Sequence, residues 1–158
     1  MINNSIDTRK FLNTCETIEK TIGKIYRQFV ASTLCDEELK AIWIKMAEEE
    51  DQHATDIGFA ARLPHEGTFK VKDLTQSRVD QLLDLTKKVL NKAMTSEIST
   101  ETAVDLTLKL EKEFLAVHIA SSLEFEKANM RQMFQSIVQS EEAHYRDIRS
   151  YHAKYFNH

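Results

Sequence analysis

The chain has 158 residues, the usual length of one domain, and its three Gly, single Pro and 29% charged residues are typical of a helical protein, because Gly and Pro interrupt helices. Its formal net charge of -4, with both signs interspersed, argues against binding to nucleic acid or to an anionic membrane. No run approaches the roughly 18 apolar residues of a membrane span, and the N-terminus has no apolar signal core. We therefore predict a soluble, cytoplasmic, all-α protein with one domain over residues 1–158.

A helical hairpin is predicted over residues 7–62. Its first helix, about residues 7–31, has core-facing positions at alternating spacings of three and four: Leu12, Cys15, Glu19, Ile22, Tyr26 and Phe29. Acidic residues at 36–38 favour the start of a second helix, about residues 35–62, which ends before Pro64. The core-facing positions of this helix are Leu39, Trp43, Met46, Glu50, His53, Ile57 and Ala60.

A crossover is predicted over residues 63–98. Residues 63–74 include Pro64 and Gly67 and form the least regular part of the chain, as expected of a connection. Residues 75–94 then predict an additional amphipathic helix, with apolar residues Val79, Leu82, Leu83, Leu85, Val89 and Leu90.

A second hairpin is predicted over residues 99–155. The core-facing positions of its first helix, about residues 100–121, are Val104, Leu108, Glu111, Leu115, His118 and Ser122. Its second helix, about residues 123–155, has Met130, Phe134, Ile137, Glu141, His144, Ile148 and Tyr151 at these positions.

Carboxylates and imidazoles stand where apolar residues are expected, near the middle of all four core-facing rows. Each hairpin has a lone glutamate in one helix and a Glu-x-x-His motif in the other, and 31 residues separate Glu19 from Glu50 while 30 separate Glu111 from Glu141. If each hairpin turns near its midpoint, equal numbers of residues rise and return, so the groups converge on one layer. This pattern matches the ligands described for di-iron and di-manganese bundles: Glu19, Glu50, His53, Glu111, Glu141 and His144.

Charge gives an independent argument for metal at this layer. Four buried carboxylates without cations repel one another and lose hydration, whereas two divalent ions balance their charge. A single Glu-x-x-His motif is common on solvated helix faces, and residues 48–51, all acidic, resemble such a face. The shared core phase in four helices favours the metal site over this interpretation.

Two neighbouring residues lie on the same faces. Tyr26 follows Glu19 by seven residues, and it is either a core aromatic with a hydrogen-bonded hydroxyl or a residue that contacts the site. His118 follows Glu111 by seven, and a core histidine or a support for a ligand is favoured over an extra ligand.

These motifs resemble the rubrerythrin-like branch of the ferritin-like superfamily. The likeness covers the four long helices and is clearest at residues 39–41, 47–53, 108–113 and 140–144. It implies an up-down-down-up four-helix bundle, with the additional helix in the long crossover between helices two and three. By resemblance, Glu50 and Glu141 are the carboxylates that bridge two irons and are the catalytic candidates, with Tyr26 beside them. Glu19 and Glu111 are terminal carboxylates, and His53 and His144 are nitrogen ligands.

The resemblance implies a di-iron oxidoreductase that reduces peroxide or dioxygen, or oxidises ferrous iron, in oxidative-stress defence. Two departures bear on this. Phe114 stands where rubrerythrins carry a further glutamate that moves with iron oxidation state, so the ligand set resembles that of bacterioferritin equally well. The chain also has no Cys-x-x-Cys pair to form a rubredoxin domain, so electrons are expected from a separate donor protein.

Alternative functions remain open at this stage. The same site suits an iron-handling protein without turnover, and the six groups also suit a metal-free interaction module with a hydrogen-bonded polar layer. Carboxylate and imidazole ligands accept manganese as well as iron. A homodimer is expected, as is common among such bundles.

Overall fold

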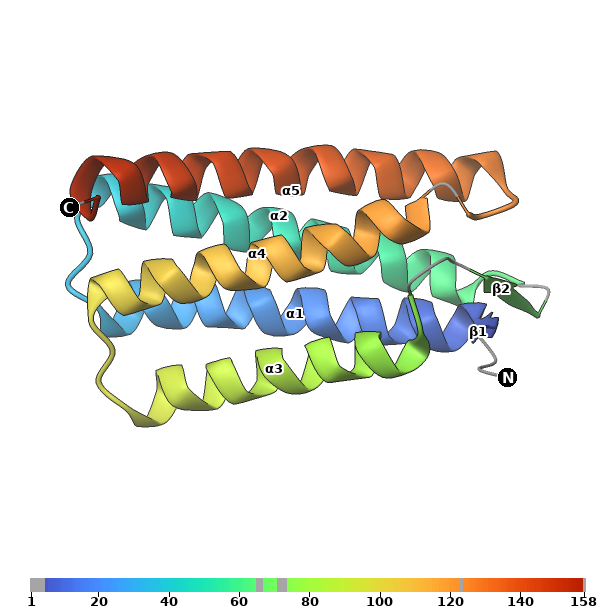
Figure 1. Cartoon of the computed structure of the whole chain (residues 1–158), viewed down its shortest axis with the longest axis horizontal. Coiled ribbons are helices and arrows are strands. Elements are labelled where there is room, and N and C mark those ends of the chain that lie inside the picture. The colour runs from blue at the N-terminus through green and yellow to red at the C-terminus, as the bar shows by residue number, and fades with distance from the viewer. Residues whose placement is uncertain (1–4, 65–66, 71–73, 123, 158) are drawn as a thin grey trace.

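In the computed structural model, which describes residues 5–64, 67–70, 74–122 and 124–157, five α-helices make up most of the chain (Figure 1). They are α1 (Thr8–Ser32), α2 (Glu37–Arg62), α3 (Gln76–Thr95), α4 (Thr100–Ser122) and α5 (Ala128–Tyr155). The prediction of an all-α protein is confirmed. Within the described ranges, no helix combines the length and the apolar character that crossing a membrane requires.

Polar side chains cap the first turns of α1, α2 and α3. Asp7 accepts a hydrogen bond from the Lys10 amide at the start of α1, and Asp36 accepts one from the Leu39 amide at the start of α2. Thr75 caps α3 in the same way. These side chains satisfy amide groups that have no partner inside the helix, which explains why three predicted boundaries lie within two residues of the observed ones.

The start of the last helix differs from the prediction. Helix α5 begins at Ala128 and not near Leu123, which itself lies outside the described residues. Residues 124–127 form the turn that reverses the chain after α4, and Phe125 is buried. The Arg131 guanidinium donates hydrogen bonds to the carbonyls of Phe125 and Glu126, both at 2.7 Å, so a side chain satisfies polar groups of this turn.

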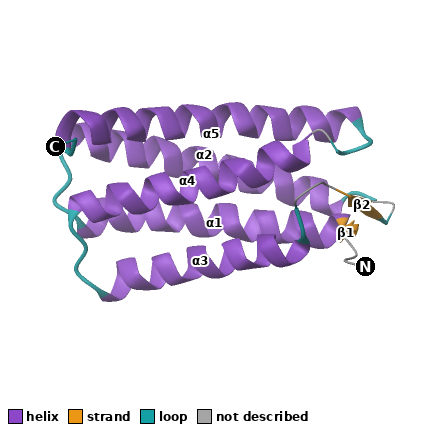
Figure 2. Ribbon diagram, in the orientation of Figure 1, coloured by secondary structure: helices purple, strands orange, loops and turns teal. Residues whose placement is uncertain are grey.

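Two short strands lie at one end of the helices (Figure 2). Strand β1 (Ser5–Asp7) pairs antiparallel with β2 (Thr68–Lys70), with Ile6 opposite Phe69. The sequence analysis missed them because three-residue strands are too short to show an alternating pattern. Gly67, just before β2, has a φ of 62°, a conformation that glycine adopts without steric cost.

The four long helices α1, α2, α4 and α5 fall into two pairs by direction. Helices α1 and α5 run one way along the long axis, while α2 and α4 run the other way (Figure 1). Contacts join α1 to α2, α2 to α5, α5 to α4 and α4 to α1, which closes a ring around a shared interior. Because α2 and α4 run in the same direction, the chain must return between them, and α3 makes this return while packing on α1 and α4.

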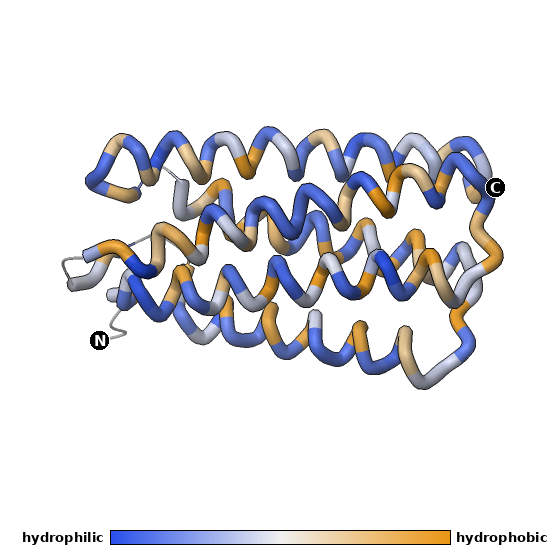
Figure 3. Tube along the Cα trace, turned by 180° about the vertical axis from the view of Figure 1, so that it is seen from behind, coloured by the Kyte–Doolittle hydropathy of each residue, from blue (hydrophilic) through white to orange (hydrophobic). Residues whose placement is uncertain are grey.

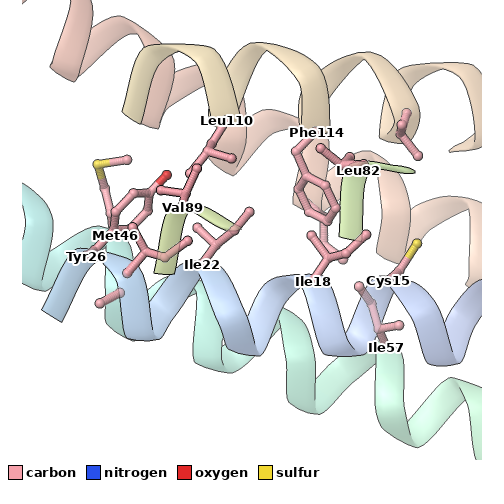
Figure 4. Close-up of a cluster of buried hydrophobic side chains, with 14 of the residues drawn as sticks. Cys15, Ile18, Ile22, Tyr26, Met46, Ile57, Leu82, Val89, Leu110 and Phe114 are labelled. Atoms are coloured by element: carbon pink, nitrogen blue, oxygen red, sulfur yellow. The ribbon is translucent and has the colours of Figure 1, made fainter. Parts of the chain in front are cut away.

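Apolar positions recur along each helix between polar ones (Figure 3). Every core-facing residue predicted for α1, α2 and α5 is buried. In α4, however, Leu108 and Leu115 are only half-buried. The fully covered face of α4 instead includes Leu110 and Phe114, which lie in the apolar cluster that Leu82 and Val89 of α3 also enter (Figure 4). Helix α4 is covered by α3 as well as by α1 and α5, so its buried face is wider than predicted.

Candidate metal centre

The helices bring all six predicted ligands into one buried cluster. Helix α1 supplies Glu19, α2 supplies Glu50 and His53, α4 supplies Glu111, and α5 supplies the remaining pair of Glu141 and His144. None of the six is more than 7% exposed. Four carboxylates and two imidazoles therefore meet inside the ring of helices, where charge is poorly hydrated.

The six side chains form two overlapping groups that share one residue. In each group, one potential ligand atom per residue lies within 4.8 Å of the others, a spacing compatible with binding a common ion. The first group contains Glu19, Glu50, His53 and Glu141, and the second contains Glu50, Glu111 and His144. Glu50 is the residue common to both.

The two oxygens of Glu50 face different histidines. Oε2 lies 3.5 Å from Nδ1 of His53, while Oε1 lies 3.0 Å from Nδ1 of His144. Each imidazole also approaches the lone glutamate of its own hairpin at 3.8 Å: His53 approaches Glu19, and His144 approaches Glu111. Both histidines thus turn Nδ1 inward, and one carboxylate connects the two groups.

The atoms that face the centre of the cluster have no hydrogen-bond partners. Within the described residues, eight such buried atoms belong to the six side chains, including both oxygens of Glu19 and of Glu50 and the Nδ1 atoms of His53 and His144. Buried polar atoms are ordinarily hydrogen-bonded, so a concentration of unpartnered atoms calls for an explanation. Carboxylate oxygens and imidazole nitrogens that converge without hydrogen-bond partners are the arrangement that a bound cation requires.

Without metal, the buried charges of the cluster shift the pKa values of its members so that several of them hold protons more tightly. Burial and the charge of Glu50 raise the pKa of Glu19, Glu111 and Glu141 well above the ordinary value. Burial also disfavours ionised Glu50, but its contacts with Glu19 and the two histidines outweigh this and lower its pKa. Burial would lower the pKa of His144, yet nearby carboxylates, Glu50 foremost, raise it to about 10. Protons thus offset much of the negative charge that two cations would balance.

Both neighbours that the sequence singled out contact a predicted ligand. The Tyr26 hydroxyl donates a hydrogen bond to Glu111 Oε1 at 2.5 Å, and both residues are buried. His118 lies with Nδ1 2.9 Å from Glu141 Oε2. Burial lowers the pKa of His118 to about 3, against the opposing charge of Glu50, so its imidazole is neutral at neutral pH.

Sequence reasoning missed the role of Glu49. Its carboxylate contacts Nε2 of His144, on the side of the ring opposite the cluster, and accepts a hydrogen bond from Ser140 at 3.1 Å. Such a partner fixes the orientation of a metal-binding imidazole. The Glu49 side chain is 36% exposed and lies within an acidic run, and the contact depends on how α2 packs against α5, so one sequence carries no signal for it.

Phe114 lies three residues after Glu111 on α4. It is buried, and its ring centroid lies 4.1 Å from that of His118. The structure thus places an apolar ring one helical turn from Glu111.

Comparisons with protein-family models, curated proteins and solved structures found no match to this chain. Its function is therefore inferred from the helical arrangement and from the buried cluster itself.

Proposed function

We propose that this protein is a ferritin-like di-metal carboxylate protein, and that its two ions are iron. The observation that carries the proposal is the pair of overlapping ligand groups sharing Glu50, all buried and with most inward atoms unpartnered. A purely structural polar layer is disfavoured because its members would hydrogen-bond one another. The helix directions around the cluster, up-down-down-up with an extra crossover helix, fit the same family.

The donor set fits iron, and also manganese. Carboxylate oxygens and imidazole nitrogens are ligands that both metals accept. Glu50 is suited to bridge two ions, because its two oxygens face the two histidines from opposite groups. Glu19 and Glu111 would be terminal ligands, and Glu141 belongs with the first group.

We further propose that the protein is a rubrerythrin-like oxidoreductase that reduces peroxide or dioxygen, or oxidises ferrous iron, in oxidative-stress defence. Bound iron would supply the one-electron steps that such reactions need. The chain itself provides a cluster closed to bulk water by its burial. Tyr26 holds Glu111 by its hydrogen bond, and Glu49 holds the outer nitrogen of His144.

Proton movement accompanies loading of this site. The ligand carboxyls with raised pKa must lose their protons before they bind cations, so metal uptake releases protons. Glu49 contacts His144 and is partly exposed to solvent, so it can accept the proton of that imidazole and pass it to water. Electrons would come from a separate donor protein, and a homodimer is the expected assembly.

A matched pair of variants tests the proposal. Glu50→Gln keeps the shape of the shared ligand but removes its charge, while Glu48→Gln makes the same change at an exposed position of α2. We expect anaerobically iron-loaded wild type and the Glu48→Gln variant to consume dioxygen or peroxide, and the Glu50→Gln variant to lose at least most of this activity.

The outcomes separate the competing functions. Bound iron that consumes neither oxidant would contradict the oxidoreductase and leave an iron-handling protein. If iron neither binds nor changes the melting temperature, the metal-free interaction module is the function that remains.

A further inference from the structure

His118 lies against the cluster without belonging to either ligand group. It is fully buried in α4, and Nδ1 lies 2.9 Å from Oε2 and 2.8 Å from Oε1 of Glu141 on α5. Two rings meet it edge-on, Phe114 with centroids 4.1 Å apart and Phe134 with centroids 5.4 Å apart. Packing therefore fixes the imidazole in the orientation that contacts Glu141.

This contact limits what Glu141 can bind. A carboxylate that bridges two cations uses one oxygen for each of them. Both oxygens of Glu50 are without hydrogen-bond partners, whereas His118 Nδ1 faces both oxygens of Glu141, at 2.9 Å from Oε2, with which it pairs, and at 2.8 Å from Oε1. In agreement with this, Glu50 belongs to both ligand groups and Glu141 only to the first. When Glu141 binds a cation it is ionised and can only accept, so His118 Nδ1 must carry the shared proton.

We propose that His118 is a positioning residue that confines Glu141 to the first metal position, so that the two ions bind in two unequal steps. This inference rests on the proposed two-metal site. The first position, with Glu19, Glu50, His53 and Glu141, offers three carboxylates and one imidazole. The second offers two carboxylates and one imidazole, and one of these carboxylates is shared with the first ion. The first position therefore binds its ion more tightly.

Substitutions at His118 separate positioning from packing. His118→Leu keeps apolar bulk but removes the donor, whereas His118→Asn retains an amide nitrogen close to where Nδ1 lies. His152→Asn is a matched control, since His152, on α5, also pairs with a carboxylate, that of exposed Asp105 at 3.2 Å. Far-UV circular dichroism and thermal melting of each metal-free variant establish that it is folded.

The test is a titration of the metal-free protein with Mn²⁺, followed by the electron paramagnetic resonance signal of the free ion. For wild type, His118→Asn and His152→Asn we expect two resolved steps of one ion each. In His118→Leu the first step should weaken about 10- to 100-fold, as is usual when a partner of a metal ligand is lost. The second step should not weaken, so the two affinities converge.

Variants of the ligands identify which position fills first. Glu111→Gln should retain the first step and lose the second, whereas Glu19→Gln should weaken the first. This result supports the unequal filling of the two positions even if His118→Leu fails to fold.

Several results would overturn the inference. Two ions bound by wild type in one step of equal affinity would refute it and leave the two-metal site intact. A His118→Leu variant that weakens both steps alike, or neither, would do the same. No bound ion in wild type would overturn the proposed site together with this inference.

Discussion

Replacing Tyr26 by Phe removes one hydrogen bond from the cluster and leaves the buried ring in place. The lost bond joins the Tyr26 hydroxyl to Glu111 Oε1 at 2.5 Å. Without metal, burial and Glu50 raise the pKa of Glu111 and so favour its neutral carboxyl, to which a hydrogen bond contributes about 0.5–1.5 kcal/mol of the free energy of unfolding. With metal bound, Glu111 is ionised and the same bond contributes about 1.5–3 kcal/mol.

The difference between these values predicts a coupling between Tyr26 and metal affinity. A gap of about 1–2 kcal/mol corresponds to metal binding that is roughly 5- to 30-fold weaker in Tyr26→Phe. For a protein of this size, the melting temperature should fall by about 3–12 °C with metal and by about 1–6 °C without it.

Thermal denaturation of wild type and Tyr26→Phe, with Mn²⁺ and with chelator, measures both quantities. Tyr155→Phe is the control, because the Tyr155 hydroxyl donates to exposed Glu38 at 2.7 Å, far from the ligands, and its loss should be small and independent of metal. If Tyr26→Phe costs the same stability with and without metal, or no more than Tyr155→Phe, the reasoning is refuted.

The remaining predictions concern pH and Glu49. Groups with raised pKa hold more protons in the folded than in the unfolded state, so metal-free stability falls as pH rises through the folded values. The pKa of His144 rises from 6.5 to about 10, so the metal-free protein loses about 1.4 kcal/mol of stability per pH unit between these two values. The raised pKa values of Glu19, Glu111 and Glu141 also lower stability as pH rises above 4.5. Urea denaturation with chelator should therefore show stability falling between about pH 7 and pH 9, and a flat or rising profile would contradict the assigned shifts. Glu49→Gln should weaken the second Mn²⁺ step about 10- to 100-fold by freeing the His144 ring, and an unchanged titration would exclude that role.

The helices were predictable because their core-facing rows are long. In α5, seven residues from Met130 to Tyr151 keep one phase, and such a run specifies both a helix and its buried face. The same rows identified the six ligand candidates, since a glutamate at a core position is conspicuous against apolar neighbours. Caps such as Asp36 marked the helix starts.

Features that depend on packing between elements were not predictable. The buried face of α4 includes Phe114 because α3 covers a side that the α4 sequence alone does not identify. The contact of Glu49 with His144 joins residues 95 positions apart, and the pairing of β1 with β2 joins residues 61 to 65 positions apart. Phe125 reads as part of a continuous helix but lies buried in the turn before it.

The two-metal site is tested by the metal content of the protein after anaerobic reconstitution with ferrous iron and removal of unbound ions. We expect about two iron ions per chain in wild type and in Glu48→Gln, and at most one in Glu50→Gln, because Glu50 is the ligand that both groups share. Wild type without bound iron, or a Glu50→Gln variant that still holds two ions, would contradict it.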